Sequence, residues 1–172
     1  MAENHTEQVF AMAELHGWSL VQVAGWHDSA AAIDKDIARL CGIPPPPDVG
    51  GVAVAGDVSL IRVGPGRIWL IDEVGEVSAR MAGAVDDAQG CVTPLGEGRR
   101  RFRLSGDCVP DVLRSLVALD LTSPSCAPGR AALAMMHRVP VLLQRIAVTT
   151  FDLYVPTTFS TSLEQWINEA AA

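Results

Sequence analysis

Short segments of alternating apolar and polar residues recur along the chain and predict β-strands joined by amphipathic helices. Residues 19–24 read Ser-Leu-Val-Gln-Val-Ala, with the alternation and β-branched content of a half-buried strand. The same kind of pattern predicts further strands at residues 59–63, 67–71, 91–93, 101–104, 131–136, 141–146 and 151–155.

Apolar residues spaced three and four apart predict four helices. The first carries Ile33 and Ile37 on one face, with Asp28 positioned to cap its start and Gly42 to end it in the left-handed conformation. In the second half, Asp107 is positioned to cap a helix whose first turn contains Pro110. The stripes of the three later helices are Val77-Met81-Val85, Val112-Leu113-Leu116-Val117 and Phe159-Leu163-Trp166-Ile167-Ala170.

The two halves of the chain follow a similar order of elements. The clearest match pairs the strand at residues 67–70 and its following helix with the strand at residues 151–154 and its following helix. We therefore predict an α+β fold of mostly antiparallel sheets with packed helices, internally duplicated. We expect a tail at residues 1–14 and one domain at 15–172, made of two similar halves at about 15–88 and 89–172.

Glycine and proline mark the connections between elements. Gly64-Pro65-Gly66 stands between two strands and predicts a tight turn. A dinucleotide-binding loop is not expected there, because Trp69 occupies the third glycine position and no helix follows. Residues 44–47 are four consecutive prolines, which we interpret as a rigid surface connection in preference to a ligand for an aromatic groove.

Composition narrows the class of protein. Hydrophobic residues make up 49% of the 172 residues, which predicts that some apolar surface is buried against a partner. No apolar run approaches the roughly 20 residues that span a bilayer, and the first residues lack the pattern of a secretory signal. We therefore expect a cytoplasmic protein that does not bind membranes.

The charge distribution argues against nucleic acid as a ligand. The net charge is −7, and an acidic surface repels phosphate backbones. Residues 99–103, Arg-Arg-Arg-Phe-Arg, run against this trend, and strand alternation places Arg101 and Arg103 on one face. They are interpreted either as an exposed strand edge kept soluble by charge or as a dock for an acidic surface of a partner.

Candidate catalytic and metal-binding residues do not form a recognisable motif. The cysteines at 41, 91, 108 and 126 lack the paired spacing of a zinc site, and the chain contains no G-x-S-x-G nucleophile motif. His137 lies in a predicted turn, where an ordinary loop histidine is the simpler interpretation. We therefore predict no catalytic, cofactor-binding or metal-binding residue in this chain.

A series of short motifs between residues 119 and 166 resembles the gamma subunit of heterotetrameric sarcosine oxidases. The motifs are, in order, Leu119-Asp120-Leu121, Ala127-Pro128-Gly129, Leu133-Ala134, Val141-Leu142-Leu143, Phe151-x-Leu153-x-Val155-Pro156 and Phe159-Ser160-x-x-Leu163-x-x-Trp166. Gly64-Pro65-Gly66-Arg67-x-Trp69-Leu70 extends the resemblance to the first half. The family has the folate-binding aminomethyltransferase fold.

The resemblance implies a non-catalytic subunit with a structural role against the alpha subunit of an enzyme that demethylates sarcosine or a related N-methyl amine. It implies alpha, beta and delta partners, with FAD, FMN, NAD, tetrahydrofolate and zinc held by those partners and none by this chain. The alternatives are a free-standing tetrahydrofolate-binding or aminomethyltransferase-like protein, and an interaction protein of this fold with an unrelated partner.

Overall fold

The computed structural model describes residues 10–172. Within them the same order of strands and helices occurs twice. The first copy consists of β1 (Ala11–Leu15), β2 (Ser19–Gly25), α1 (Ala30–Cys41), β3 (Val52–Ala55), β4 (Val58–Gly64), β5 (Arg67–Asp72) and α2 (Glu76–Met81). The second consists of β6 (Gly90–Pro94), β7 (Arg99–Ser105), α3 (Val109–Leu116), β8 (Arg130–Met136), β9 (Val139–Ala147), β10 (Thr150–Pro156) and α4 (Ser160–Ala171).

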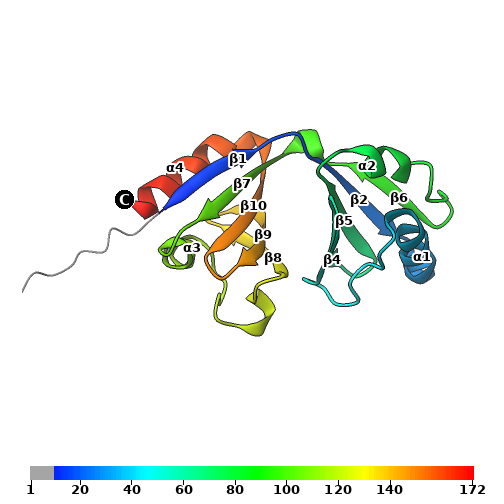
Figure 1. The fold of residues 1–172 in the computed structure, drawn as a ribbon, viewed down its shortest axis with the longest axis horizontal. Coiled ribbons are helices and arrows are strands. Elements are labelled where there is room, and N and C mark those ends of the chain that lie inside the picture. Colours follow the sequence, from blue (N-terminus) through cyan, green and yellow to red (C-terminus); the bar gives the residue numbers. More distant parts are fainter. Residues whose placement is uncertain (1–9) are drawn as a thin grey trace, which may run out of the picture.

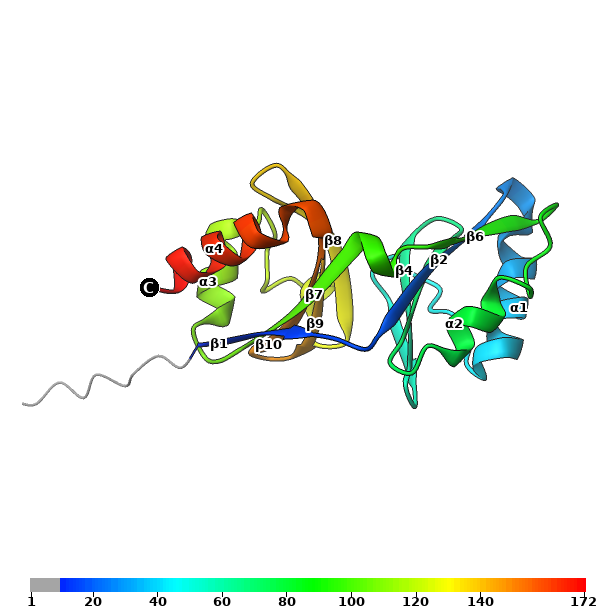
Figure 2. The ribbon, with the colours of Figure 1, turned by 90° about the horizontal axis from the view of Figure 1, so that it is seen from above.

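The first strand of each copy pairs with the sheet of the other copy. One sheet has the order β1-β7-β10-β9-β8 and the other β3-β4-β5-β2-β6, and every pairing within them is antiparallel. Without β1 and β6, the remaining orders β7-β10-β9-β8 and β2-β5-β4-β3 correspond strand for strand. The chain therefore crosses between the sheets twice, from β1 to β2 and from β6 to β7 (Figure 2).

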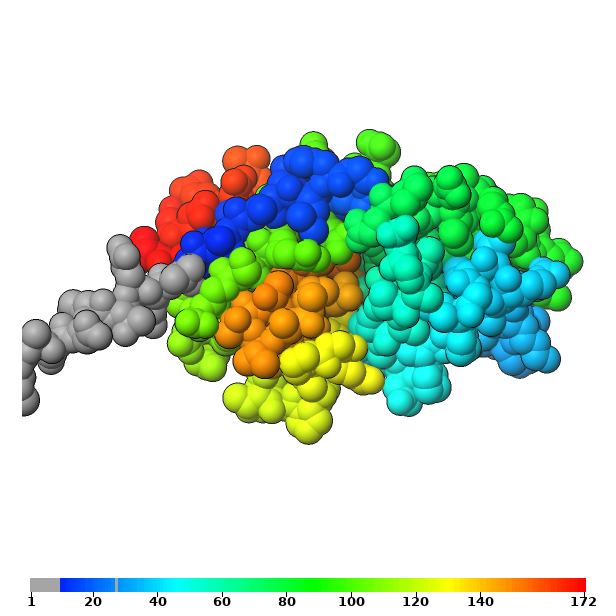
Figure 3. Space-filling view, viewed as in Figure 1, coloured from blue at the N-terminus to red at the C-terminus, as the bar shows by residue number. Residues whose placement is uncertain are grey.

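The molecule has four layers, with helices outside and the two sheets inside (Figure 1). Alternation along each strand sends one set of side chains toward the helices and the other toward the opposite sheet. In β5, for example, Ile68 and Leu70 pack in the cluster under α1 and α2, while Trp69 and Ile71 join the cluster between the sheets. Figure 3 shows the two halves in contact along this junction.

The predicted fold class is confirmed: the structure is a mixed α+β fold of antiparallel sheets with packed helices. Gly42 ends α1 as predicted, with φ of 74° and its N–H donating to the Ala38 carbonyl. Within the described part of the chain, no helix combines the length and apolarity needed to cross a bilayer.

The predicted helix caps at Asp28 and Asp107 are wrong. A side-chain cap requires an extended residue before the helix. The residues directly before the two helices are Ser29 and Cys108, and not the predicted aspartates. Both have helical backbone angles and make no side-chain cap. The chain enters both helices through a tight turn, and backbone carbonyls accept the first N–H groups; Val109, for instance, donates to the Gly106 carbonyl.

The structure changes the boundary expected for the tail. Residues 1–9 lie outside the described residues, but residues 11–14 belong to β1, which pairs with β7 and is not a tail. The boundary expected near residue 88 falls between α2 and β6, where the second copy of the element order begins. The two halves are not separate in space, because β1 and β6 each pair with the sheet of the other copy.

The four prolines at residues 44–47 connect α1 to β3, packed against the fold. Pro45 and Pro46 are buried. The carbonyl of Pro46 accepts a 2.5 Å hydrogen bond from Nε of Arg62, and that guanidinium also pairs with Asp34 of α1 at 2.6 Å. These contacts support a rigid connection, although one that is more buried than a surface loop.

Candidate functional site

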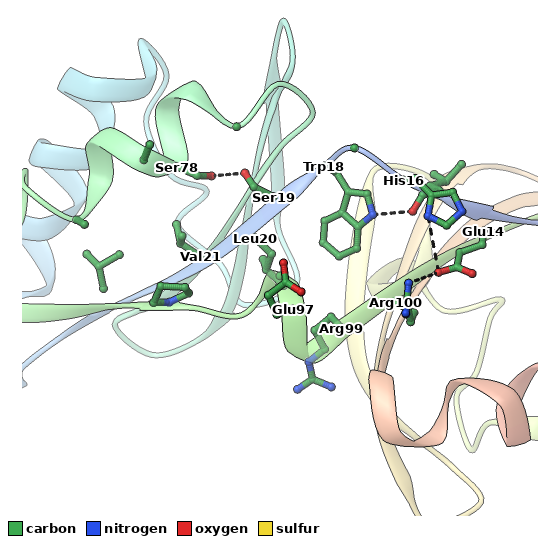
Figure 4. A pocket seen from close by; sticks show the side chains of 18 residues that line it. Glu14, His16, Trp18, Ser19, Leu20, Val21, Ser78, Glu97, Arg99 and Arg100 are labelled. Atoms are coloured by element: carbon green, nitrogen blue, oxygen red, sulfur yellow. Dashed lines mark hydrogen bonds and ion pairs between the residues drawn. The ribbon is translucent and has the colours of Figure 1, made fainter.

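A cavity lies where the two crossing connections pass each other. It has a volume of about 550 Å³ and is lined by the residues between β1 and β2, the residues between β6 and β7, and one side of α2 (Figure 4). This size is within the range of pockets that bind small molecules or side chains of a partner. We call this cavity the crossover pocket.

Trp18 forms one wall of the crossover pocket, and its position is fixed by contacts on both sides. Its indole N–H donates to the Leu15 carbonyl at 2.8 Å. Its ring meets Tyr154 of the other sheet edge to face, with centroids 5.7 Å apart. The tryptophan thus joins the β1–β2 connection to the cluster between the sheets.

Asp72 organises the polar end of the pocket beside α2. Its carboxylate accepts backbone N–H groups of Val74, Val77 and Ser78 at 2.8–3.1 Å. Burial opposes ionisation, but these N–H donors outweigh it, so the pKa of Asp72 lies below its ordinary value. Ser78 in turn holds Ser19, with the two hydroxyl oxygens 2.7 Å apart.

Charged side chains on the pocket rim differ in whether they are paired within the chain. Arg100 binds Glu14 at 3.0 Å, and His16 lies 3.9 Å from the same carboxylate. The carboxylate of Glu97 has no hydrogen bond or ion pair with any residue that the structure describes. Its side chain turns toward the Trp18 side of the pocket, whereas Arg99 extends the other way, over the Trp69 ring (Figure 4).

The serine hydroxyls of the pocket contact each other. The Ser19 hydroxyl contacts the Ser78 hydroxyl and the backbone carbonyl of Asp72, and no basic side chain among the described residues is hydrogen-bonded to either serine. Among residues 10–172, no three His, Cys, Asp or Glu side chains gather as a metal site. What the pocket offers is an apolar wall, an aromatic ring, and the charged side chains of Glu97 and Arg99, neither of which forms an ion pair with a described residue.

A second polar cluster lies between the sheets and includes both arginines singled out by the sequence. Arg101 contacts Asp152 of β10 at 2.6 Å and Glu73, which follows β5 in the other sheet, at 2.5 Å. Arg103 binds the same Asp152 through both carboxylate oxygens, at 2.7 and 2.8 Å. Asp152 is fully buried. Its single carboxylate forms ion pairs with both arginine side chains.

The structure corrects the position expected for Arg101 and Arg103. The two do share one face of β7, but that strand lies between β1 and β10 and is not an edge. Arg101 is 5% exposed and neutralised inside the chain, so it is not a free cation available to a partner. Arg103 keeps 40% of its side chain exposed, and its contact with a partner stays a prediction.

Electrostatics around Arg101 keep its charge fixed. Burial opposes the charged form, but Tyr154, Glu73 and Asp152 outweigh it and raise the pKa of Arg101. Burial also raises the pKa of Tyr154, whose hydroxyl donates to Gln144 at 3.1 Å. The cluster is therefore a permanent ionic and aromatic bridge between the sheets.

Sequence reasoning missed Trp18, Glu97, Asp72 and Asp152. Each looks ordinary in sequence, because its role depends on strands that are paired across the halves. A usable signal existed only for Trp18, an aromatic residue beside a glycine at the start of a strand. His137 occupies the β8–β9 turn with φ of 51°, and its ring meets Trp166 edge to face with centroids 4.5 Å apart.

Comparison with curated proteins finds two relatives of the same description. The chain is 28% identical over 138 residues to the sarcosine oxidase subunit gamma of Corynebacterium sp. (strain P-1), covering 78% of this chain and 67% of that one. It is 26% identical over 172 residues to the sarcosine oxidase subunit gamma of Arthrobacter sp., covering 99% and 84%. No family model matches the chain.

Comparison with solved structures supports the same fold. A chain of the heterotetrameric sarcosine oxidase from Corynebacterium sp. U-96 superimposes with a TM-score of 0.83 at 23% identity, covering 95% of this chain and 84% of that chain. The glycine cleavage system aminomethyltransferase T of Bartonella henselae gives 0.67 at 13% identity, covering 95% and 46%. The resemblance to gamma subunits and the aminomethyltransferase-like fold predicted from the sequence are confirmed.

Proposed function

We propose that this chain is the small, non-catalytic gamma subunit of a sarcosine oxidase-type heterotetramer. The observation that carries the proposal is the match to two curated gamma subunits, one of which aligns along 99% of this chain. The fold shared with a chain of a solved heterotetrameric sarcosine oxidase supports it. Its role is to complete the assembly, and the chemistry belongs to other subunits.

The assembled enzyme would oxidise the N-methyl group of sarcosine or a related N-methyl amine. We assign FAD, FMN, NAD, tetrahydrofolate and zinc to the alpha, beta and delta partners, as the family resemblance implies. The cytoplasmic location expected from the sequence stays a prediction.

A free-standing tetrahydrofolate-binding or aminomethyltransferase-like protein is the alternative. The similarity to aminomethyltransferase T supports only a shared fold, and this chain covers less than half of that protein. The curated relatives favour the subunit.

A tagged pull-down from the source cells tests the proposal. We expect a yellow eluate that contains two larger flavin- and nucleotide-binding chains, identified by mass spectrometry. A colourless eluate with this chain alone would contradict it. Calorimetric titration of the isolated chain with tetrahydrofolate then tests the alternative, for which micromolar binding is the positive result.

A further inference from the structure

β8 is an edge strand with exposed apolar side chains. It ends the sheet order β1-β7-β10-β9-β8 and pairs along one side with β9 (Figure 1). Leu133 is 55% exposed and Met135 is 49% exposed. Alternation places both on the same face as Ala131, which packs in the cluster between the sheets. Edge strands of soluble proteins are usually protected by charge, proline or a covering segment. The middle of β8 has no such protection from its own side chains.

The outer side of the β8 backbone is paired at both ends and open in the middle. At one end the Ala131 N–H donates to the Gly50 carbonyl at 2.9 Å, and at the other Met136 forms a bridge with Val117. Outward and inward groups alternate along an antiparallel strand, so the N–H and carbonyl of Leu133 also point outward. Among residues 10–172, no backbone group outside β9 bonds to them.

A groove of about 280 Å³ lies beside this open stretch, and we call it the edge groove. Its lining includes Ala132 and Leu133 of β8, Val49 and Gly50 of the connection before β3, and Arg130. Because neighbouring residues from both faces of β8 take part, the groove follows the edge of the strand. Its volume is below the usual range of small-molecule pockets, and it suits a side chain with a short stretch of backbone.

Arg130 has hydrogen-bonding capacity that the described residues leave unused. One terminal nitrogen donates to the Val49 carbonyl at 3.1 Å. Its Nε is buried without a hydrogen-bond partner among the described residues, and no acidic residue lines the edge groove. Arg62, the other charged residue of the lining, already pairs with Asp34. A buried donor without an acceptor is costly, so the edge groove favours an occupant that brings a carboxylate.

We propose that the edge groove is the docking site for an extended segment of a partner subunit, which adds a short strand at Leu133 and places an aspartate or glutamate at Arg130. The added backbone pairs with the outward N–H and carbonyl of Leu133, and its apolar side chains cover Leu133 and Met135. Gly50 supports this geometry, because its carbonyl already accepts a hydrogen bond from β8 as a neighbouring strand would. The inference rests on the proposed function.

A second copy of this chain fits the edge groove less well than a different subunit. If two copies paired through β8, each would bring residues 130–136, which read Arg-Ala-Ala-Leu-Ala-Met-Met and contain no acid. Such a pairing would add a second arginine and supply no carboxylate to Arg130. Charge complementarity therefore favours a partner of another sequence.

Two variants of the edge groove test the proposal in the co-expressed complex. Leu133→Pro removes the outward N–H without removing a hydrogen bond to β9, and Arg130→Glu reverses the charge. The matched controls are Val54→Pro, at an exposed apolar position of the edge strand β3, and Arg80→Glu, at an exposed position of α2. Retention of this chain on a tagged partner subunit is measured over a series of salt concentrations. Circular dichroism and thermal unfolding check that every variant is folded.

Hydrogen exchange of the wild-type chain gives a second measurement that needs no variant. In the complex, peptides that cover residues 131–135 should exchange about tenfold more slowly than in the isolated chain, because the outward N–H groups become paired. Peptides that cover residues 52–55 of β3 should change by less than about twofold. Unchanged exchange at residues 131–135 would overturn the proposal.

Each variant of the edge groove is expected to reduce retention about tenfold, with the effect of Arg130→Glu declining as salt rises, while the controls stay within about twofold of the wild type. Wild-type retention of Leu133→Pro would overturn the strand pairing, and wild-type retention of Arg130→Glu would overturn the acidic contact. A dimer of this chain that Leu133→Pro abolishes in light scattering, with normal retention in the complex, would also overturn the proposal. Failure of the wild-type chain itself to join a flavin-containing complex would instead refute the proposed function.

Discussion

Asp152 is a fully buried carboxylate that two arginines share, and it ties β10 to β7 at the junction of the sheets. Removing one partner from a buried ionic group leaves uncompensated charge in a poorly solvated place. Here two guanidinium groups, Arg101 and Arg103, would be left with only Glu73 as a nearby acid. The stability of the junction therefore depends on this side chain more than on any exposed ion pair.

We predict that Asp152→Asn lowers the free energy of unfolding by about 3–5 kcal/mol. Urea unfolding followed by circular dichroism measures the change. The matched control is Asp111→Asn, which breaks an exposed ion pair with Arg114 and should cost no more than about 1 kcal/mol. Similar losses in the two variants would show that the buried cluster has no special role.

The ionised carboxylate of Asp72 makes the free energy of unfolding depend on pH. Because its pKa is lower in the folded chain than in the unfolded chain, its contribution is present above about pH 4 and is lost as the pH falls through the folded pKa. The Asp72→Asn variant should be less stable than the wild type at pH 7, and its stability should decline less between pH 5 and pH 3. Urea unfolding at the three pH values measures this.

The control for this experiment is Asp36→Asn, whose carboxylate makes an exposed ion pair with Arg39. It should keep the wild-type dependence on pH. If Asp72→Asn has the same acid slope as the wild type, the N–H donors at the start of α2 do not stabilise the ionised carboxylate.

At the scale of elements, the exchanged strands depend on close backbone approach. β6 joins β2 through Gly90, where an added Cβ would lie 2.4 Å from the Ala24 carbonyl oxygen and 3.1 Å from Ile33. Any larger residue must therefore separate β6 from β2 or push α1 outward. The pairing of β6 with β2 at the edge of this sheet therefore relies on glycine at position 90.

We predict that Gly90→Ala destabilises the protein by about 1–3 kcal/mol, as overpacking does in other cores. Gly98→Ala is the matched control, because an added Cβ there meets nothing within 4 Å. It should leave the free energy of unfolding within about 1 kcal/mol of the wild type. Thermal unfolding of both variants checks the difference, and a neutral Gly90→Ala would contradict the close approach of β6.

Sequence patterns predicted the elements well where the determinants are local. The strand at residues 67–71, its turn at Gly64-Pro65-Gly66 and the end of α1 at Gly42 all depend on neighbouring residues. The pairing of β1 with β7 and of β6 with β2 does not depend on neighbouring residues, and a local pattern does not identify the strand with which another strand pairs. Arg101 was therefore interpreted as part of an edge, although two strands flank it.

The candidate site was less predictable than the fold for the same reason. The crossover pocket is formed by connections some 80 residues apart in sequence, together with residues of α2. Acidic residues such as Glu97 and Asp152 look alike in sequence, but one faces solvent and the other is buried. Burial of this kind is a property of the assembled sheets.

At the scale of the whole molecule, the two halves exchange their first strands across the junction of the sheets. The chain's high apolar content agrees with a subunit that buries surface in a larger assembly. Arg101 binds Asp152 in one sheet and Glu73 beside the other sheet, so an ionic bridge spans the junction. The two halves are therefore joined both by strand pairing and by this bridge.

Native mass spectrometry of the co-expressed oxidase, with and without this chain, tests the central claim most directly. We predict one copy of the chain in each complex, and a loss of intact complex and of sarcosine-dependent hydrogen peroxide when the chain is omitted. A complete, active complex that forms without it, with the chain purifying alone, would contradict its role as the gamma subunit.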